Sequence, residues 1–133
     1  SFWRPTDYLK YFNNLKIIVI NRDPRSIYYS MYSRNSKAYP SSNIITFAKW
    51  YKKIRNNQLK IKNKNVYIIQ YEKFLNNFEI ESKKLNNFLK ISQKIKSKFD
   101  LNFSKNNILK AKNKLNKQDK IYLEKKLKNF LVW

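Results

Sequence analysis

The sequence contains no glycine, no cysteine and no histidine. Because cysteine is absent, the chain can form neither a disulfide framework nor a thiolate metal site. Because histidine is absent as well, a transition-metal site, a catalytic triad and histidine acid–base chemistry are excluded within this chain. A glycine-rich phosphate loop is excluded too, since such loops need backbone conformations that other residues resist. No metal cofactor is therefore expected.

Acidic residues are scarce. There are 8 of them against 30 lysines and arginines, which gives a formal net charge of +22. A field of this strength attracts polyanions. The basic residues are mostly lysine and accompany abundant asparagine and isoleucine, and the lysine runs at 60–64 and 94–98 are interrupted by other residues. The charge therefore predicts an anionic ligand without identifying it, and it favours solvated surfaces over a nucleic-acid partner.

Long apolar runs are also missing. No segment is long and apolar enough to span a membrane, and the N-terminal residues show no signal-peptide pattern. These two absences lead us to expect a cytoplasmic location. The 133 residues are enough for one domain with a core of its own, so we expect a single domain over residues 1–133.

What is present is an alternation of strand and helix patterns. They predict a strand at 16–21, helices at 24–35 and 43–59, and a strand at 65–70. This order is typical of a parallel crossover, so the expected fold class is α/β. The other expected elements are a short helix at 8–12, a helix at 78–91, a basic connector at 92–102 and a helix at 117–131.

The stretch from 16 to 30 is the most informative part of the sequence. Residues 17–20 form a continuous apolar run rich in β-branched side chains, which is typical of a strand covered on both faces. Asp23 suits the N-cap of a following helix, and Pro24 suits its first position because an N–H there has no intrahelical partner. A strand is therefore expected to lead directly into a capped helix.

The start of that helix has the features of an anion site. Free backbone N–H groups and the positive end of the helix dipole lie at its first turn, and Arg22 stands just outside it. Ser26 and Ser30 are one helical turn apart, so their hydroxyls share a face. Charge-assisted hydrogen bonds contribute about 1.5 to 3 kcal/mol each, so a few of them hold a phosphate selectively.

Together these residues resemble a known family. A hydrophobic strand, then Arg22-Asp23-Pro24-Arg25, then the hydroxyl of Ser30 is similar to the 3′-phosphate-binding segment of sulfotransferases that use 3′-phosphoadenosine-5′-phosphosulfate (PAPS). Later segments follow the order of this family as well. They are 47–55, similar to a helix before the next strand; 65–74, similar to a strand ending in Tyr-Glu-Asp; 85–91, similar to a helix end; and 103–108, similar to a late nucleotide-contacting segment of bacterial carbohydrate-type members.

The resemblance implies a partial P-loop-NTPase-like sulfotransferase fold with parallel strands, crossover helices and a helical C-terminus. The family carries its glycine-rich loop and its catalytic base before the strand that corresponds to 16–21. Since this sequence has no glycine, it resembles the C-terminal part of the sulfotransferase domain, without the N-terminal phosphate loop. The catalytic base is not identified in this sequence.

Four residues match nucleotide-binding positions of the family. The resemblance implies that Arg22 and Ser30 hold the 3′-phosphate of PAPS. It also implies that Tyr71 lies near the adenine and that Lys105 approaches the 3′-phosphate. These four residues form the expected co-substrate site.

Other positions depart from the family pattern. Ser26 stands where many members have aspartate, Lys73 replaces the acid of Tyr-Glu-Asp, and Leu109 replaces a common glycine. Leu109 works against a close backbone contact with the nucleotide, because only glycine leaves room for one. Arg25 and Arg34 are expected to face solvent or the acceptor.

The resemblance implies transfer of a sulfuryl group from PAPS to an acceptor hydroxyl or amine, with a carbohydrate acceptor by similarity to bacterial members. Two other hypotheses stay open. One is a basic nucleic-acid-binding module that stacks bases on exposed aromatic rings, although these rings fall at core-like helical spacing. The other is an inactive, truncated half-domain that binds a partner. The rings in question are those of Tyr28, Tyr29, Tyr32 and Trp50.

Overall fold

The computed structural model describes residues 5–34, 38–92 and 99–133. The basic connector expected at 92–102 falls largely on residues 93–98, which lie outside the described residues, as does the lysine run at 94–98. The elements, in chain order, are η1 (Pro5–Lys10), β1 (Ile17–Asn21), α1 (Pro24–Tyr32), α2 (Ile44–Leu59), β2 (Val66–Gln70), α3 (Tyr71–Asn76), α4 (Phe78–Leu89), α5 (Leu101–Lys114), α6 (Lys117–Lys126) and η2 (Lys128–Phe130).

The two strands pair in parallel, as the order of strand, helices and strand predicted. Their register runs from Ile17 opposite Val66 to Asn21 opposite Gln70. The chain crosses from β1 to β2 through α1 and α2. Since the strands are parallel and in step, both end at the same edge of the sheet. The residues that follow β1 and β2 are thereby brought together.

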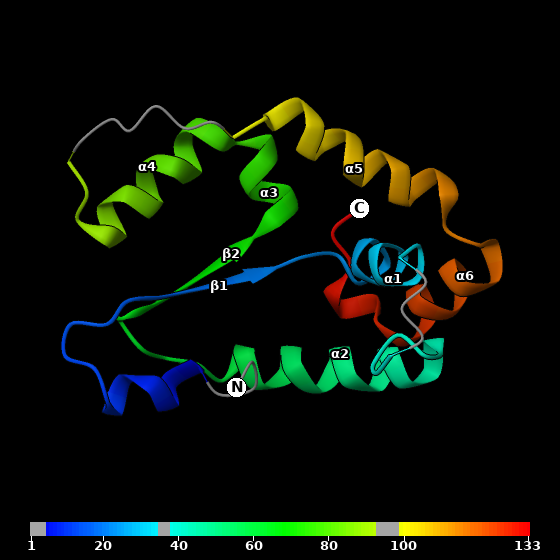
Figure 1. Cartoon of the computed structure of the whole chain (residues 1–133), viewed down its shortest axis with the longest axis horizontal. Coiled ribbons are helices and arrows are strands. Elements are labelled where there is room, and N and C mark those ends of the chain that lie inside the picture. The colour runs from blue at the N-terminus through cyan, green and yellow to red at the C-terminus, as the bar shows by residue number, and fades with distance from the viewer. Residues whose placement is uncertain (1–4, 35–37, 93–98) are drawn as a thin grey trace.

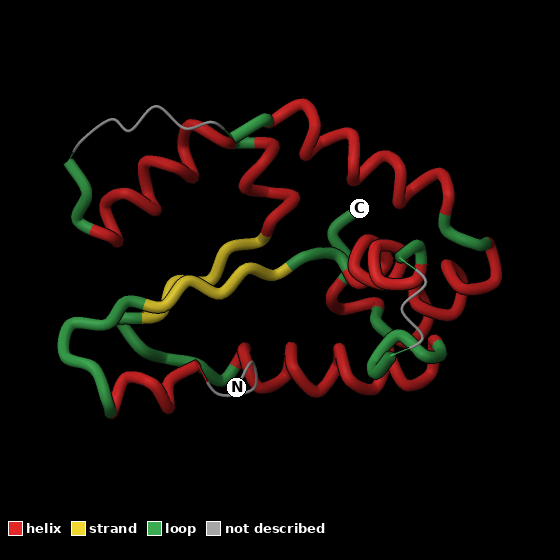
Figure 2. Tube along the Cα trace, in the orientation of Figure 1, coloured by secondary structure: helices red, strands yellow, loops and turns green. Residues whose placement is uncertain are grey.

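The strand pair lies in the middle of three layers (Figure 1). Helices α3 and α4 lie on one side of the strands, and α2 with η1 lies on the other (Figure 2). Helix α4 packs on β2, where the rings of Tyr67 and Phe88 stack with centroids 5.1 Å apart. Helices α1 and α6 lie beyond the carboxyl end of β1. The mixed α/β fold class is therefore confirmed.

The main core lies beyond the ends of the strands, among α1, α2 and α6. Phe47 of α2 and Leu123 of α6 are fully buried there. The ring of Phe47 stands 5.1 Å from that of Tyr28 of α1 and 6.0 Å from that of Tyr51. Burying a side chain of this size contributes roughly 1.5–3 kcal/mol. This core fixes α1, and with it the end of β1, against α2.

Several boundaries differ from the expected ones. Helix α1 ends at Tyr32 and not at 35, and the helix expected at 117–131 stops at Lys126 before the short η2. Helix α5 was not predicted, because its two buried residues, Ser104 and Ala111, are small and form no apolar stripe. Helix α3 was also missed, since it is six residues long and follows β2 without a loop.

Because the sequence contains no glycine, another residue caps the C-terminal end of α4. Lys90 caps this helix in the left-handed conformation, with φ at 59°. Glycine usually takes this position, because a side chain is crowded there by the backbone. The N–H of the following residue, Ile91, still donates to the carbonyl of Asn86 at 3.0 Å. The cap is therefore formed at a conformational cost.

We expect Lys90→Gly to stabilise the protein by about 0.5–1 kcal/mol, because glycine removes the crowding at positive φ. Urea unfolding measures the change. Lys83→Gly, at an exposed position inside α4, is the matched control and should cost about 1 kcal/mol. Destabilisation by both substitutions would contradict the assignment of this cap.

Candidate functional site

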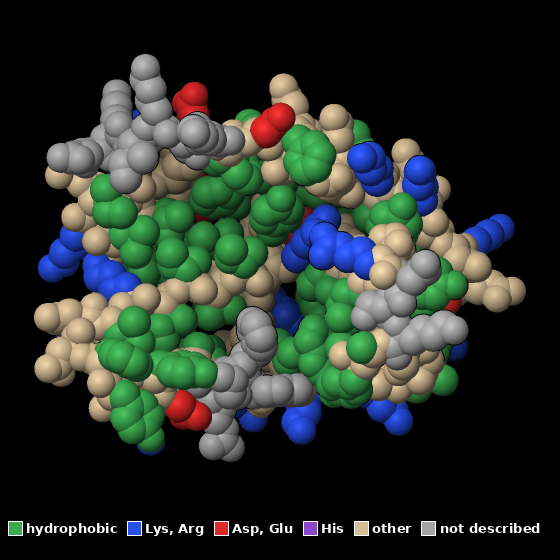
Figure 3. Space-filling view, in the orientation of Figure 1, with side chains coloured by type: hydrophobic (Ala, Val, Ile, Leu, Met, Phe, Trp, Pro, Cys, Tyr) green, Lys and Arg blue, Asp and Glu red, His purple; other side chains and the backbone are tan. Residues whose placement is uncertain are grey.

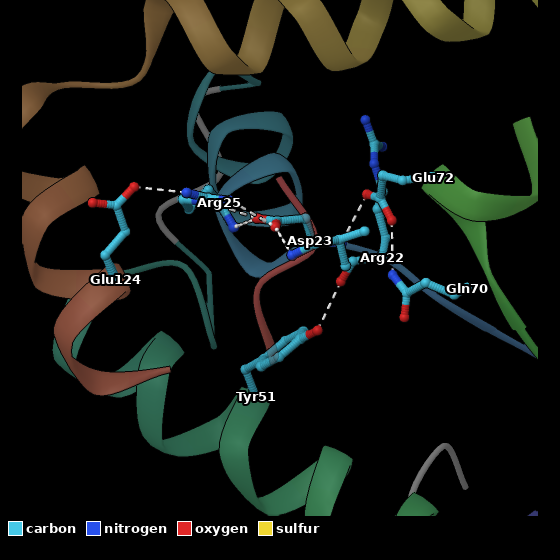
Figure 4. Close-up of polar contacts among 8 residues, drawn as sticks. Arg22, Asp23, Arg25, Tyr51, Gln70, Glu72 and Glu124 are labelled. Atoms are coloured by element: carbon cyan, nitrogen blue, oxygen red, sulfur yellow. Dashed lines mark hydrogen bonds and ion pairs between the residues drawn. The ribbon is translucent and has the colours of Figure 1, made fainter. Parts of the chain in front are cut away.

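The candidate site lies where β1 and β2 end and α1 begins (Figure 4). Glu72, which is 4% exposed, connects the two strand ends. Its Oε1 accepts from the backbone N–H of Asp23 at 2.8 Å, and its Oε2 accepts from the side-chain amide of Gln70 at 2.7 Å. Both carboxylate oxygens are thus engaged in holding the turn between β1 and α1.

Arg22 occupies the centre of this turn. Its backbone carbonyl accepts from the Tyr51 hydroxyl at 2.7 Å. Its guanidinium lies 5.2 Å from the ring centroid of Tyr71, the first residue of α3. Among the described residues it forms no ion pair, and its buried Nε has no hydrogen-bond partner. The backbone of Arg22 is therefore fixed, while its guanidinium has no carboxylate partner among the described residues.

The N-terminus of α1 has the predicted cap. The Asp23 side chain accepts from the N–H of Arg25 at 2.9 Å, and Pro24 stands at the first helical position. Ser26, in the first turn, is fully buried, and its Oγ has no partner among the described residues. Buried polar atoms without partners are rare in folded proteins. Two of them, Arg22 Nε and Ser26 Oγ, lie within one turn of chain.

The interpretation of Arg25 as a solvent or acceptor-side charge was wrong. Arg25 is only 3% exposed. Its Nη2 pairs with Asp23 Oδ2 at 2.9 Å, and its Nη1 pairs with Glu124 Oε1 at 2.6 Å. The partner on α6 is far away in the sequence, so local pattern gave no signal for it. Arg34, by contrast, is exposed as expected.

The four predicted site residues are brought together only in part. Arg22 and Tyr71 are in contact. Ser30 is half-buried on α1, and Lys105 is half-buried on α5, which packs against both α1 and α3. Among the described residues no hydrogen bond joins the side chain of Ser30 or Lys105 to Arg22. One pair of the four residues is thus in direct contact, while Ser30 and Lys105 lie on the neighbouring helices α1 and α5.

An apolar groove of about 960 Å³ runs along β1 and ends at Arg22. Its walls come from η1, β1 and α2, and Ile18 and Ile20 are 38% and 63% exposed beside it. Hydrophobic side chains gather on this face over the strands and η1 (Figure 3). Within the described residues β1 pairs only with β2, so its other edge is open. Arg22 is the charged residue at one end of this groove.

The Tyr51 hydroxyl is held as a donor by its surroundings. Burial is the main cause that raises its pKa, and the nearby carboxylates of Asp23 and Glu72 add to the effect, while Arg55 opposes it. Burial also lowers the pKa of the Arg55 guanidinium, which donates to Gln58 at 2.8 Å. Tyr51 therefore keeps its proton at neutral pH and donates it to the Arg22 carbonyl.

Within residues 5–34, 38–92 and 99–133, no group of three or more acidic side chains is placed to hold a metal ion. No helix in the same ranges has the length and apolar character needed to cross a membrane.

A family model supports the resemblance seen in the sequence. The model described as the sulfotransferase family matches residues 2–94, which include β1, α1, α2 and β2. Arg22, Ser30 and Tyr71 lie inside this match, and Lys105 lies outside it. No curated protein and no solved structure matches the chain. The match covers more than half of the sequence, so the chain belongs to the sulfotransferase family.

Tyr51→Phe should lower the free energy of unfolding at pH 7 by about 0.5–1.5 kcal/mol, because the Arg22 carbonyl loses its donor. Because folding raises the pKa of Tyr51, its protonated hydroxyl contributes fully to stability at pH values below about 10, the ordinary pKa of tyrosine. As the pH rises above that value, this contribution to the free energy of unfolding is lost. The stability difference between the two proteins should therefore narrow above pH about 10.

Denaturant unfolding of both proteins from pH 7 to pH about 11 checks this dependence. Tyr11→Phe is the matched control, because Tyr11 is 78% exposed. The stability difference between wild type and Tyr11→Phe should not decrease as the pH rises. A difference between wild type and Tyr51→Phe that stays constant over this range would contradict the buried donor role.

Proposed function

We propose that this chain binds PAPS through its 3′-phosphate and serves in sulfuryl transfer to an acceptor hydroxyl or amine. Membership of the sulfotransferase family supports the general reaction. One observation carries the finer proposal: the Arg22 guanidinium stands at the carboxyl end of a parallel strand, without an ion pair among the described residues and with an unpartnered Nε. Open α/β sheets bind ligands at this edge.

In this proposal the 3′-phosphate binds between Arg22 and the first turns of α1. Arg22 supplies charge-assisted hydrogen bonds, the positive end of the α1 dipole favours the anion, and Ser30 adds a hydroxyl. Tyr71 lies against Arg22 and presents a ring for the adenine. Lys105 on α5 approaches from the neighbouring helix. An anion at this place also gives the buried Arg22 Nε an acceptor.

In this proposal the reaction is an in-line displacement at sulfur. The acceptor oxygen or nitrogen forms the new bond to sulfur while the bond from sulfur to the 5′-phosphate oxygen breaks, and a general base takes the acceptor proton. Positioning and charge stabilisation provide most of the rate in such a transfer. A carbohydrate acceptor is proposed from the similarity to bacterial members. The base is not identified among the residues of this chain.

We further propose a partial P-loop-NTPase-like fold, in which residues 1–133 form one domain that corresponds to the C-terminal part of a sulfotransferase domain. The open edge of β1 and the absence of glycine support this view. A chain without glycine has no glycine-rich loop for the 5′-phosphosulfate, so in this proposal the sequence holds PAPS through its 3′-phosphate and adenine.

The nucleic-acid hypothesis receives less support from the site. Tyr28, one of the expected stacking rings, is 4% exposed and belongs to the main core. Trp50 is half-buried and packs against the same core. Tyr28 is therefore unavailable for stacking on bases, whereas Trp50 also lines the apolar groove and Tyr32 is 63% exposed. The basic charge of the chain then serves an anionic co-substrate.

Calorimetric titration with adenosine 3′,5′-bisphosphate at physiological salt tests the proposal. We expect selective binding over 5′-AMP, and Arg22→Ala should weaken it by about 10- to 100-fold, because charge-assisted hydrogen bonds are lost. Arg34→Ala, which removes an exposed arginine after the same helix, is the matched control and should change affinity by less than about twofold.

Two results would contradict the proposal. One is binding of a short oligonucleotide with no preference for the bisphosphate, which would favour a basic nucleic-acid-binding module. The other is the absence of a binding signal with the bisphosphate, with 5′-AMP and with the oligonucleotide, which would favour an incomplete half-domain.

A further inference from the structure

The carboxylate of Asp23 is the centre of a buried network next to the proposed phosphate site. Asp23 is fully buried. Its Oδ1 accepts from the N–H and Nε of Arg25 at 2.9 and 3.0 Å. Its Oδ2 accepts from Arg25 Nη2 at 2.9 Å and from the backbone N–H of Val132 at 2.8 Å. Four donors thus fill the hydrogen-bonding capacity of this carboxylate.

Arg25 is held from three directions. Asp23 binds one edge of its guanidinium, and Glu124 of α6 binds Nη1 at 2.6 Å (Figure 4). The face of the guanidinium lies 3.6 Å from the ring centroid of Trp133. Lys112 of α5 lies 5.0 Å from the centroid of the same ring. We call the group of Asp23, Arg25, Glu124, Val132 and Trp133 the Asp23 clamp.

The Asp23 clamp joins two separate parts of the chain. Asp23 and Arg25 lie inside the segment matched by the sulfotransferase family, residues 2–94. Glu124, Val132 and Trp133 lie outside it. The C-terminal end of the chain passes beside the start of α1 (Figure 1). The residue next to Arg22 is therefore fixed by a segment that the family match does not cover.

The Asp23 clamp also affects the charge at the site. The Asp23 carboxylate is adjacent in sequence to Arg22, and a free carboxylate there would repel a phosphate. Burial disfavours the charged form of Arg25, but hydrogen bonds and attraction from Asp23 and Glu124 outweigh it, so the pKa of the guanidinium lies above its ordinary value. Arg25 thus stays charged and is the ion-pair partner of Asp23 as well as of Glu124, while Arg22 forms no ion pair among the described residues.

We propose that Arg25 and Trp133 are positioning residues for the phosphate-binding turn, with the Trp133 ring holding the Arg25 guanidinium on Asp23. This inference rests on the proposed function for its ligand. The essential feature of Trp133 is its ring face, because its Nε1 has no partner among the described residues. Phenylalanine therefore retains the interaction, and leucine retains only the apolar bulk.

Titration of adenosine 3′,5′-bisphosphate into Trp133→Leu and Trp133→Phe tests the role of the ring. We expect Trp133→Leu to bind about five- to tenfold more weakly and Trp133→Phe to stay within about twofold of wild type. Ile121→Leu, at an exposed position on α6, is the control for a substitution at the surface. Equal affinities of the Leu and Phe variants, whether weak or unchanged, would overturn the role of the ring face.

Amide hydrogen exchange gives a readout that does not depend on the ligand. The N–H of Asp23, which donates to Glu72, should exchange at least about fivefold faster in Trp133→Leu and at the wild-type rate in Trp133→Phe, while the amides of β2 stay unchanged. Val132→Pro, which deletes one donor to Asp23, should have the same effect as the Leu variant.

The two proposals fail in different ways. Wild-type protein that does not bind the bisphosphate overturns the proposed function, and faster Asp23 exchange in Trp133→Leu and Val132→Pro then still supports the positioning role. An Asp23 amide that exchanges at the wild-type rate in both variants overturns the positioning role, whatever the affinity of wild type.

Discussion

The ion pair between Asp23 and Arg25 is the interaction on which the arrangement at the strand ends depends. Asp23 is fully buried, and a buried carboxylate is tolerated only when its charge is compensated and its oxygens are hydrogen-bonded. Removing one partner of such a pair typically costs about 3–5 kcal/mol, because the other charge stays buried alone. The same pair caps α1 and anchors Val132. The start of α1 and the end of the chain are therefore held by one group.

The scarcity of acidic residues makes their placement informative. Of the 8 acidic residues in the chain, three converge on the turn between β1 and α1, namely Asp23, Glu72 and Glu124. In a chain of net charge +22 most surface cations have no carboxylate to meet. At this turn the three carboxylates accept hydrogen bonds from Arg25, from Gln70 and from the N–H groups of Asp23 and Val132. Specific hydrogen bonds and ion pairs therefore hold this turn in place, and the net charge of the chain does not explain it.

Local patterns were sufficient to predict the strand β1, the cap at Asp23 and the parallel pairing, because each depends on neighbouring residues. The sequence placed Arg22 and Tyr71 directly after the two expected strands, but their contact was not predicted and is a finding of the structure. The burial of Arg25 did not follow, because its partner Glu124 is 99 positions away. Helix α5 was missed because it buries small residues. Ion pairs between residues far apart in the sequence, and a helix without a clear apolar periodicity, could therefore not be predicted from the sequence.

The proposed phosphate site depends on the availability of Arg22. Three carboxylates lie around it. Both oxygens of Glu72 accept, from a backbone N–H and from Gln70, and both oxygens of Asp23 accept, from Arg25 and Val132. Glu124 accepts from Arg25 through Oε1. Arg22 has no ion pair among the described residues, although its backbone is fixed by Tyr51. Arginine also offers a planar fork that matches phosphate oxygens, whereas lysine offers a point charge. In a chain whose basic residues are mostly lysine, Arg22 is therefore the residue to which we assign the proposed phosphate.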